Sequence, residues 1–245
     1  MASPVKTRAI VITSIRYGES DLIVTFLTDC HGIVKGIAKS ALKSRKRFAG
    51  CFEPFTLLEL TYRDKGTGGL AGIDAAEISD AHYGIRENLD RIEAGARMLE
   101  LVSAVEAGGQ ECGHVFSLLD KTLGLIEKSK DPAPLCGIFL VKYIGISGYK
   151  IPYESCHKCG KPLAGNGAYY PGGYGLFCAG CKGLDDPPRL SPGCIAFIKG
   201  AEEIDLARMG RLKLSKPAEA ELFGFLKRYV SGVIGKSLKT LENIP

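Results

Sequence analysis

Short segments that alternate apolar and polar residues fill the first third of the chain. Such alternation over four to eight residues predicts half-buried β-strands. Five segments have this pattern: residues 5–15, 21–28, 33–38, 55–62 and 70–78. Turn formers separate them, and Gly32 can adopt the positive φ that a tight turn requires. Five short strands in about 80 residues predict a small β-barrel, for which an OB-fold is a candidate.

Helical periodicity replaces this pattern from about residue 83 onward. Apolar residues then recur at intervals of three and four, which predicts amphipathic helices. The segments are residues 85–102, 114–128, 134–147 and 217–239. The third is apolar enough to be central. Ser191 followed by Pro192 predicts the start of a further helix, because serine caps and proline is tolerated in the first turn. We therefore expect an α+β protein with an OB-fold barrel in residues 1–80 and a helical domain in residues 81–245.

Two Cys-x-x-Cys pairs interrupt the helical part. Cys156 and Cys159 form the first pair, Cys178 and Cys181 form the second, and eighteen residues lie between the pairs. This spacing is typical of a four-thiolate zinc site, since each pair can direct two sulfurs at one tetrahedral ion. Four protein ligands leave no position for a substrate, so we expect one structural Zn²⁺ in a knuckle at residues 153–184. Redox dithiols, an iron site of the same geometry, or His157 as a ligand are the alternatives.

Composition places the chain among ordinary globular proteins. Of 245 residues, 45% are hydrophobic and 24% are charged. No apolar run is long enough to span a membrane, and no signal-peptide pattern precedes the first strand. The five cysteines outside the knuckle are scattered, which suits reduced thiols in the cytoplasm.

The net charge of +5 matters less than a basic run between the third and fourth strands. No acidic residue occurs between Asp29 and Glu53. The run holds six cations in thirteen residues: Lys35, Lys39, Lys43, Arg45, Lys46 and Arg47. Clustered cations neutralise phosphates, so this run is the candidate DNA-binding surface. The alternative is a solvated loop.

Three phenylalanines follow the basic run, at positions 48, 52 and 55. Aromatic rings beside cations can stack on nucleic-acid bases. They can equally fill the barrel core, and we favour the core for Phe52 and Phe55.

Catalytic motifs are weak or missing. There is no phosphate-binding loop that would predict ATP hydrolysis. A glycine-rich stretch at residues 66–71 joins two strands rather than opening a helix, so we interpret it as a hairpin turn. The four histidines show no nucleophile or acid–base grouping. We therefore expect no enzyme activity. A nuclease would need carboxylates that converge on a divalent metal. The linear sequence has no such cluster, although folding could bring distant carboxylates together.

Several segments together resemble the RecO family of bacterial recombination mediators. Besides the two cysteine pairs, the resemblance rests on residues 17–24, 28–32, 38–40, 146–149 and 229–240. Their order and spacing cover most of the chain. One departure is Ser40, where a glycine is commoner in the family, and it concerns the local loop geometry.

The resemblance implies a function in DNA repair. It implies an N-terminal OB-fold, a helical domain and an embedded zinc knuckle. It also implies binding to single- and double-stranded DNA, annealing of complementary strands, and work with RecR. These activities would help to place RecA on DNA covered by single-strand-binding protein, whose C-terminal tail would contact the helical domain. The competing hypothesis is a zinc-stabilised protein-interaction module without a direct DNA role.

Overall fold

The computed structural model describes residues 3–44, 47–64, 66, 69–105, 112–173, 175–183, 187–235 and 238–242. The chain forms two compact units, Met1–Glu87 with Glu106–Glu127, and Asn88–Val105 with Lys128–Pro245. Each unit is described by itself.

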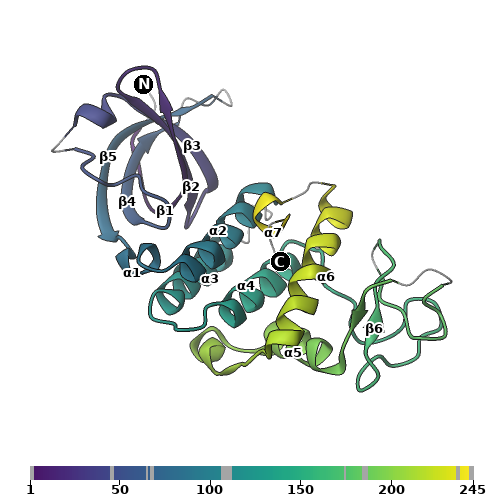
Figure 1. Ribbon diagram of the computed structural model, residues 1–245. Helices are drawn as coiled ribbons and strands as arrows, with labels where there is room; N and C mark the ends of the chain where they lie inside the picture. The colour runs from purple at the N-terminus through teal and green to yellow at the C-terminus, as the bar shows by residue number, and fades with distance from the viewer. Residues whose placement is uncertain are drawn as a thin grey trace. The chain divides into compact units, whose positions relative to one another are not determined.

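Five strands of the first unit close into a barrel (Figure 1). They are β1 (Val5–Tyr17), β2 (Asp21–Thr28), β3 (Gly32–Ala38), β4 (Leu57–Arg63) and β5 (Ala71–Asp80). The order around the barrel is β1-β2-β3-β5-β4, with β4 returning to β1. All neighbours are antiparallel except β3 and β5, which pair in parallel. The predicted five-stranded OB-fold barrel is confirmed.

The barrel core explains the alternation in the sequence. Inward residues such as Val11, Phe26 and Leu58 are completely buried. Their neighbours along the strands point to the other face of the sheet, and several of these, such as Ile10 and Leu27, are buried as well. A register shift between Val11 and Thr13 re-aims the second half of β1. The turn at Gly32 has φ of 63°, as the sequence predicts.

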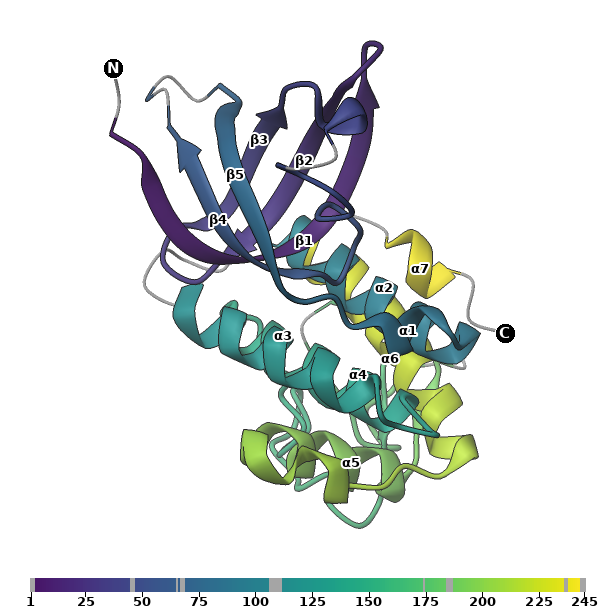
Figure 2. The same ribbon diagram turned by 90° about the vertical axis from the view of Figure 1, so that its left-hand side faces the viewer.

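Helix α3 (Cys112–Ile126) belongs to the barrel's unit. It packs against β2, and Figure 2 shows it below the barrel. The Arg8 guanidinium lies 3.0 Å from the Asp120 carboxylate and 5.0 Å from the centroid of the Phe116 ring. The short helix α1 (Tyr83–Arg86) follows β5. The sequence analysis placed residues 112–126 in the helical domain of residues 81–245. Their contacts instead group them with the barrel. The division into domains at residue 80 stays a prediction.

The second unit is built around helix α4 (Ala133–Ile146). Ten of its fourteen residues are buried, which confirms its predicted central position. Helices α2 (Leu89–Ala104), α5 (Pro192–Glu203) and α6 (Lys216–Ile234) pack against it, as does the 3₁₀ turn η3 (Leu206–Arg211). Ser191 caps α5 through a 3.2 Å hydrogen bond from the Cys194 amide, as predicted. No helix among the described residues is long and apolar enough to cross a membrane.

Two predicted helices are shorter than the periodicity indicated. The first is divided into α1 and α2 because Asn88 is extended and caps α2 by accepting from the Arg91 amide. The last ends at Gly235, which adopts φ of 69°, and a separate short helix α7 (Lys239–Glu242) follows. A left-handed glycine at this position terminates a helix even where apolar spacing continues beyond it.

The cysteine-containing segment has little regular structure. Strand β6 (Ala168–Tyr169) pairs with β7 (Arg189–Leu190), and Tyr169 also pairs with Phe177. The segment is anchored on α6 by Tyr170, whose ring lies 5.1 Å from that of Phe225 and 6.0 Å from that of Tyr229.

Candidate nucleic-acid interface and metal centre

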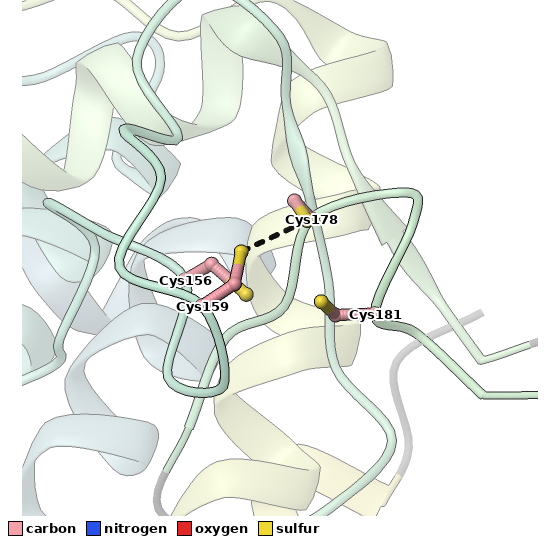
Figure 3. A group of neighbouring side chains, drawn as sticks. All are labelled: Cys156, Cys159, Cys178 and Cys181. Atoms are coloured by element: carbon pink, nitrogen blue, oxygen red, sulfur yellow. Dashed lines mark hydrogen bonds between the residues drawn. The ribbon is translucent and has the colours of Figure 1, made fainter.

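Four cysteines of the second unit converge on one point (Figure 3). The Sγ atoms of Cys156, Cys159, Cys178 and Cys181 all lie within 4.8 Å of one another, and those of Cys159 and Cys178 are 3.7 Å apart. A Zn–S bond of about 2.3 Å gives a tetrahedron whose sulfurs are separated by about 3.8 Å. The donor set and spacing therefore fit a tetrahedral metal with soft ligands. The expected four-cysteine cluster is confirmed as an arrangement of side chains.

The backbone explains why two distant Cys-x-x-Cys pairs meet. In the first pair, the chain turns so that the Gly160 amide donates to the Cys156 carbonyl at 2.9 Å, with φ of 69° at Gly160. In the second pair, the Cys181 amide donates to the Cys178 carbonyl at 2.9 Å. The two turns are tied together because the His157 amide donates to the Leu176 carbonyl at 2.9 Å.

The thiols do not ionise alike. Burial disfavours the Cys156 thiolate, but hydrogen bonds from the backbone amides of Cys178, Cys159 and Lys158 outweigh it and lower the Cys156 pKa to about 6. Side-chain hydrogen bonding to Cys159, together with burial and the nearby Cys156 charge, raises the Cys181 pKa to about 12. Four thiolates this close therefore require a cation between them.

His157 is exposed, and its ring packs edge-on against Phe177 at 5.8 Å between centroids. The described residues that come together as potential ligands here are cysteines. His157 therefore lies outside the group of potential ligands that the four cysteines form.

The basic run lies on the barrel's unit, along β3 and the loop after it. Lys35, Lys39, Lys43 and Arg47 are all exposed, and within the described part of the chain none of them forms an ion pair with a carboxylate. Arg45 and Lys46 lie outside the described residues. The run is thus a group of uncompensated positive charges at the barrel surface.

The loop that carries these cations is held in place by local hydrogen bonds. The Ser40 amide donates to the Asp21 carboxylate at 2.8 Å, and the Leu42 amide donates to the Ser20 carbonyl at 3.0 Å. The Arg47 guanidinium donates to the Lys39 carbonyl at 2.9 Å and lies 4.5 Å from the centroid of the Phe48 ring. The described part of the loop is therefore attached to the β1–β2 turn, and the Arg47 side chain is attached to the backbone of Lys39.

All three phenylalanines after the run are buried. Phe48, Phe52 and Phe55 expose 3%, 5% and 6% of their surface. Phe48 and Phe52 join the barrel core, where Phe52 packs edge-on against Phe26 at 6.0 Å. The core prediction is confirmed for Phe52. Phe55 is buried but lies outside this core cluster, with the Arg86 guanidinium 6.0 Å from the centroid of its ring. Base stacking on the three rings is excluded in this conformation.

The second unit has a cavity of about 250 Å³ between α2, α6 and the start of α4. Four carboxylates line it, from Asp90, Glu93, Asp131 and Glu219. Its two cations are already engaged: Arg97 with Glu93 at 3.1 Å, and Lys216 with Glu219 at 2.9 Å and Asp131 at 3.5 Å. This lining disfavours an acidic peptide. We assign no partner to the cavity.

A second group of potential ligands occurs in the barrel's unit, at Asp80, His82 and Glu127. Buried His82 places Nδ1 3.1 Å from a Glu127 oxygen, and the other Glu127 oxygen accepts from the Gly84 amide at 3.0 Å. These contacts tie the end of α3 to the start of α1. We interpret the group as structural and call the contacts of Glu127 with His82 and Gly84 the latch. No sequence pattern indicated the latch, because His82 and Glu127 are 45 residues apart.

Two family profiles together match nearly the whole chain. The family profile described as "Recombination protein O N terminal" matches residues 1–82, and "Recombination protein O C terminal" matches residues 86–242. This chain belongs to the RecO family.

Similar proteins match over most of their length. A protein from Syntrophus aciditrophicus is 31% identical over 242 residues, covering 97% of this chain and 93% of its own. A protein from Pelobacter propionicus is 32% identical over 248 residues, with 98% and 95% covered. A protein from Rubrobacter xylanophilus is 33% identical over 208 residues, with 82% of each covered. All three carry the name "DNA repair protein RecO".

Proposed function

We propose that this protein is a non-enzymatic recombination mediator in DNA repair that binds single- and double-stranded DNA through the basic run. The observation that carries the proposal is the exposed row of Lys35, Lys39, Lys43 and Arg47 without carboxylate partners. A solvated loop usually carries charges of both signs, whereas the charged residues from 35 to 47 are all positive. Arg45 and Lys46 extend the same run in sequence.

Strand annealing is the reaction such a surface supports. Two DNA strands repel each other through their phosphates, and cations that neutralise those phosphates let the strands approach. The bases must stay free to pair, which suits contacts made to the backbone. Phosphate contacts also weaken as salt rises, so the bound strands can be released without ATP.

Membership of the RecO family supports partners in DNA repair. We propose that the protein acts with RecR and with the C-terminal tail of single-strand-binding protein, and that it thereby promotes RecA loading. This activity belongs in the bacterial cytoplasm, where the chromosome lies.

For the cysteine cluster we propose one Zn²⁺ held by Cys156, Cys159, Cys178 and Cys181. With four protein thiolates the metal supplies no catalysis, and its contribution is to fix the two turns of the knuckle. The 3.7 Å sulfur separation and the lowered Cys156 pKa support this assignment.

Charge reversal tests the DNA-binding surface. Changing Lys43, Arg45, Lys46 and Arg47 to Glu should abolish binding of a fluorescent single-stranded oligonucleotide while the protein stays folded. The slope of log K against log salt is negative, and each lost phosphate contact should make it shallower by about 0.7. In a control variant, Lys121, Lys128 and Lys130 are changed to Glu. These lysines are also exposed, but each has an acidic residue next to it in the sequence. Unchanged affinity in the basic-run variant, measured on a folded protein, would remove the assignment.

A protein-interaction module without a DNA role is the second candidate. The observation that favours it is an apolar surface at the end of β1, where Ile15 and Tyr17 are 62% and 56% exposed. Such side chains are typical of protein-binding surfaces. DNA binding that disappears on charge reversal separates the two candidates in favour of the mediator.

A further inference from the structure

Three side chains of the cysteine-containing segment share one face of a small sheet. Tyr169 and Phe177 exchange both backbone hydrogen bonds, at 2.9 and 3.0 Å. On its other side, Tyr169 lies directly opposite Arg189 in the β6–β7 pair. Residues directly opposite each other in a sheet project to the same face. Phe177, Tyr169 and Arg189 therefore form a row across three strand segments.

Two more groups extend this row. The His157 ring lies 5.8 Å from that of Phe177 at an interplanar angle of 70°. The Lys182 ammonium lies 4.8 Å from the centroid of the Tyr169 ring. His157 and Arg189 are exposed, and the side chains between them are half-buried. We call these five residues (His157, Tyr169, Phe177, Lys182 and Arg189) the ring face.

The opposite side of the same strand is fixed in the protein interior. Tyr170, the next residue after Tyr169, is 2% exposed and packs edge-on against Phe225 of α6. Its hydroxyl donates to the Gly173 carbonyl at 2.8 Å. Because successive strand residues face opposite ways, anchoring Tyr170 holds Tyr169 toward solvent. The ring face is thus a rigid surface.

Flat rings interleaved with cations fit one kind of ligand. Every nucleic-acid base has a face that stacks on an aromatic ring, and every nucleotide adds a phosphate that a nearby cation can neutralise. Only unpaired bases expose their faces, so a duplex does not fit. In the barrel's unit, by contrast, the three phenylalanines after the basic run are buried and cannot stack.

We propose that the ring face binds single-stranded nucleic acid, with bases stacked on Tyr169 and Phe177 and a backbone phosphate at Arg189. The proposal rests on the proposed function, in which the protein handles single strands. It adds a surface on the second unit that is separate from the basic run. One protein would then hold one strand by its phosphates on the basic run and another by its bases on the ring face.

Paired oligonucleotides test the stacking. Binding of the full-length, zinc-loaded protein to oligothymidylate is compared with binding to an abasic oligonucleotide of equal length and charge. Changing Tyr169 and Phe177 together to Leu should weaken oligothymidylate binding by about tenfold and leave abasic binding within about twofold, since stacking acts on bases alone. Arg189→Gln should instead make the negative slope of log K against log salt shallower by about 0.7 for both oligonucleotides.

The control is Tyr83→Leu. Tyr83 lies on α1, is 70% exposed, and has a guanidinium, that of Arg86, 5.8 Å from its ring centroid. It therefore matches Tyr169 in chemistry without belonging to the ring face, and its variant should bind both oligonucleotides normally. Zinc content and unfolding midpoint are measured for every variant. If the double variant loses metal, the single Tyr169→Leu variant decides, because Tyr169 is not next to a cysteine.

Each outcome has one meaning. Equal weakening for both oligonucleotides, or no weakening for oligothymidylate, overturns the ring face and leaves the basic run standing. A wild-type protein that binds the two oligonucleotides equally also overturns only the ring face. A wild-type protein that binds neither overturns the proposed function itself.

Discussion

The Sγ atoms of Cys159 and Cys178 lie 3.7 Å apart, although the two residues are nineteen positions apart in the chain. That separation is the edge of a tetrahedron around a zinc ion with bonds of about 2.3 Å. A disulfide, with its bond of about 2.0 Å, does not fit the pair. The two cysteine turns are therefore arranged for a shared cation.

Removing two ligands should release the metal. In a Cys178→Ser/Cys181→Ser variant we expect less than one zinc per chain by elemental analysis and an unfolding midpoint lowered by several degrees, because metal binding stabilises the fold that forms its site. Binding of an abasic oligonucleotide, which the basic run holds by its phosphates, should change little, since the basic run belongs to the other unit. Oligothymidylate should bind more weakly, because the ring face lies in the same segment as the cysteines. Zinc-free wild-type protein of normal stability would contradict the structural-metal assignment.

Cys30→Ser is the control for that experiment, because Cys30 is an exposed cysteine outside the cluster. It should leave metal content and midpoint unchanged. Alkylation provides a second measurement. Among the cysteines outside the cluster, Cys30 is exposed and the rest are buried, so zinc-loaded protein should react chiefly at this residue. Chelation should add up to four reactive thiols.

The backbone of Ser40 predicts a stabilising substitution. Ser40 has φ of 56° and ψ of 26°, a left-handed conformation that costs a residue with a Cβ about 1 kcal/mol. Glycine removes that cost but gains freedom in the unfolded chain. We expect Ser40→Gly to raise the free energy of unfolding by about 0.5 kcal/mol in urea titrations.

Ser44→Gly is the matched control for Ser40→Gly. Ser44 has φ of −86°, so glycine relieves no strain there, and its hydroxyl accepts from the Arg47 amide at 3.1 Å. This variant should lose about 0.5–1 kcal/mol. Equal effects at the two positions would show that left-handed strain at Ser40 is not the cause.

A core substitution separates packing from base stacking in the barrel. Phe52 is 5% exposed and contacts the rings of Phe26 and Phe48. Phe52→Leu should therefore destabilise the protein by about 1 kcal/mol and leave oligonucleotide affinity within twofold. Tyr17→Leu, at a 56% exposed position, should not change stability measurably. Loss of affinity at Phe52 with unchanged stability would revive base stacking on this ring.

The latch between His82 and Glu127 should contribute to the stability of the barrel's unit. Glu127→Ala removes the acceptor for both the buried His82 ring and the Gly84 amide, so we expect a loss of about 1–3 kcal/mol in the free energy of unfolding. Glu93→Ala removes a 51% exposed partner of Arg97 and should cost less than 0.5 kcal/mol. Similar small losses at both glutamates would show that the latch is no stronger than a surface ion pair.

The sequence predicted the barrel well because each strand signal is local. Alternation and turn residues such as Gly32 place all five strands to within a few residues. The departure at Ser40 from the family pattern also marked a position where the backbone is left-handed. The spacing of the cysteine pairs indicated the metal cluster, although it could not give the distances between sulfurs.

What the sequence missed depends on contacts between distant segments. Apolar spacing extends beyond Gly235, so periodicity alone does not show that α6 ends there. The grouping of α3 with the barrel depends on contacts such as Arg8 with Asp120, which are 112 residues apart. The ring face likewise depends on the pairing of Tyr169 with both Phe177 and Arg189, and no local pattern predicts that pairing.

Annealing tests the central claim most directly. Two complementary strands, each coated with single-strand-binding protein, are mixed with the wild-type protein and with the variant that reverses Lys43, Arg45, Lys46 and Arg47, without ATP and over a range of salt. We expect the wild-type protein to accelerate annealing, the effect to fade as salt rises, and the folded variant to have none. Annealing that the variant promotes equally, or that salt leaves unchanged, would contradict the assignment of this surface to DNA.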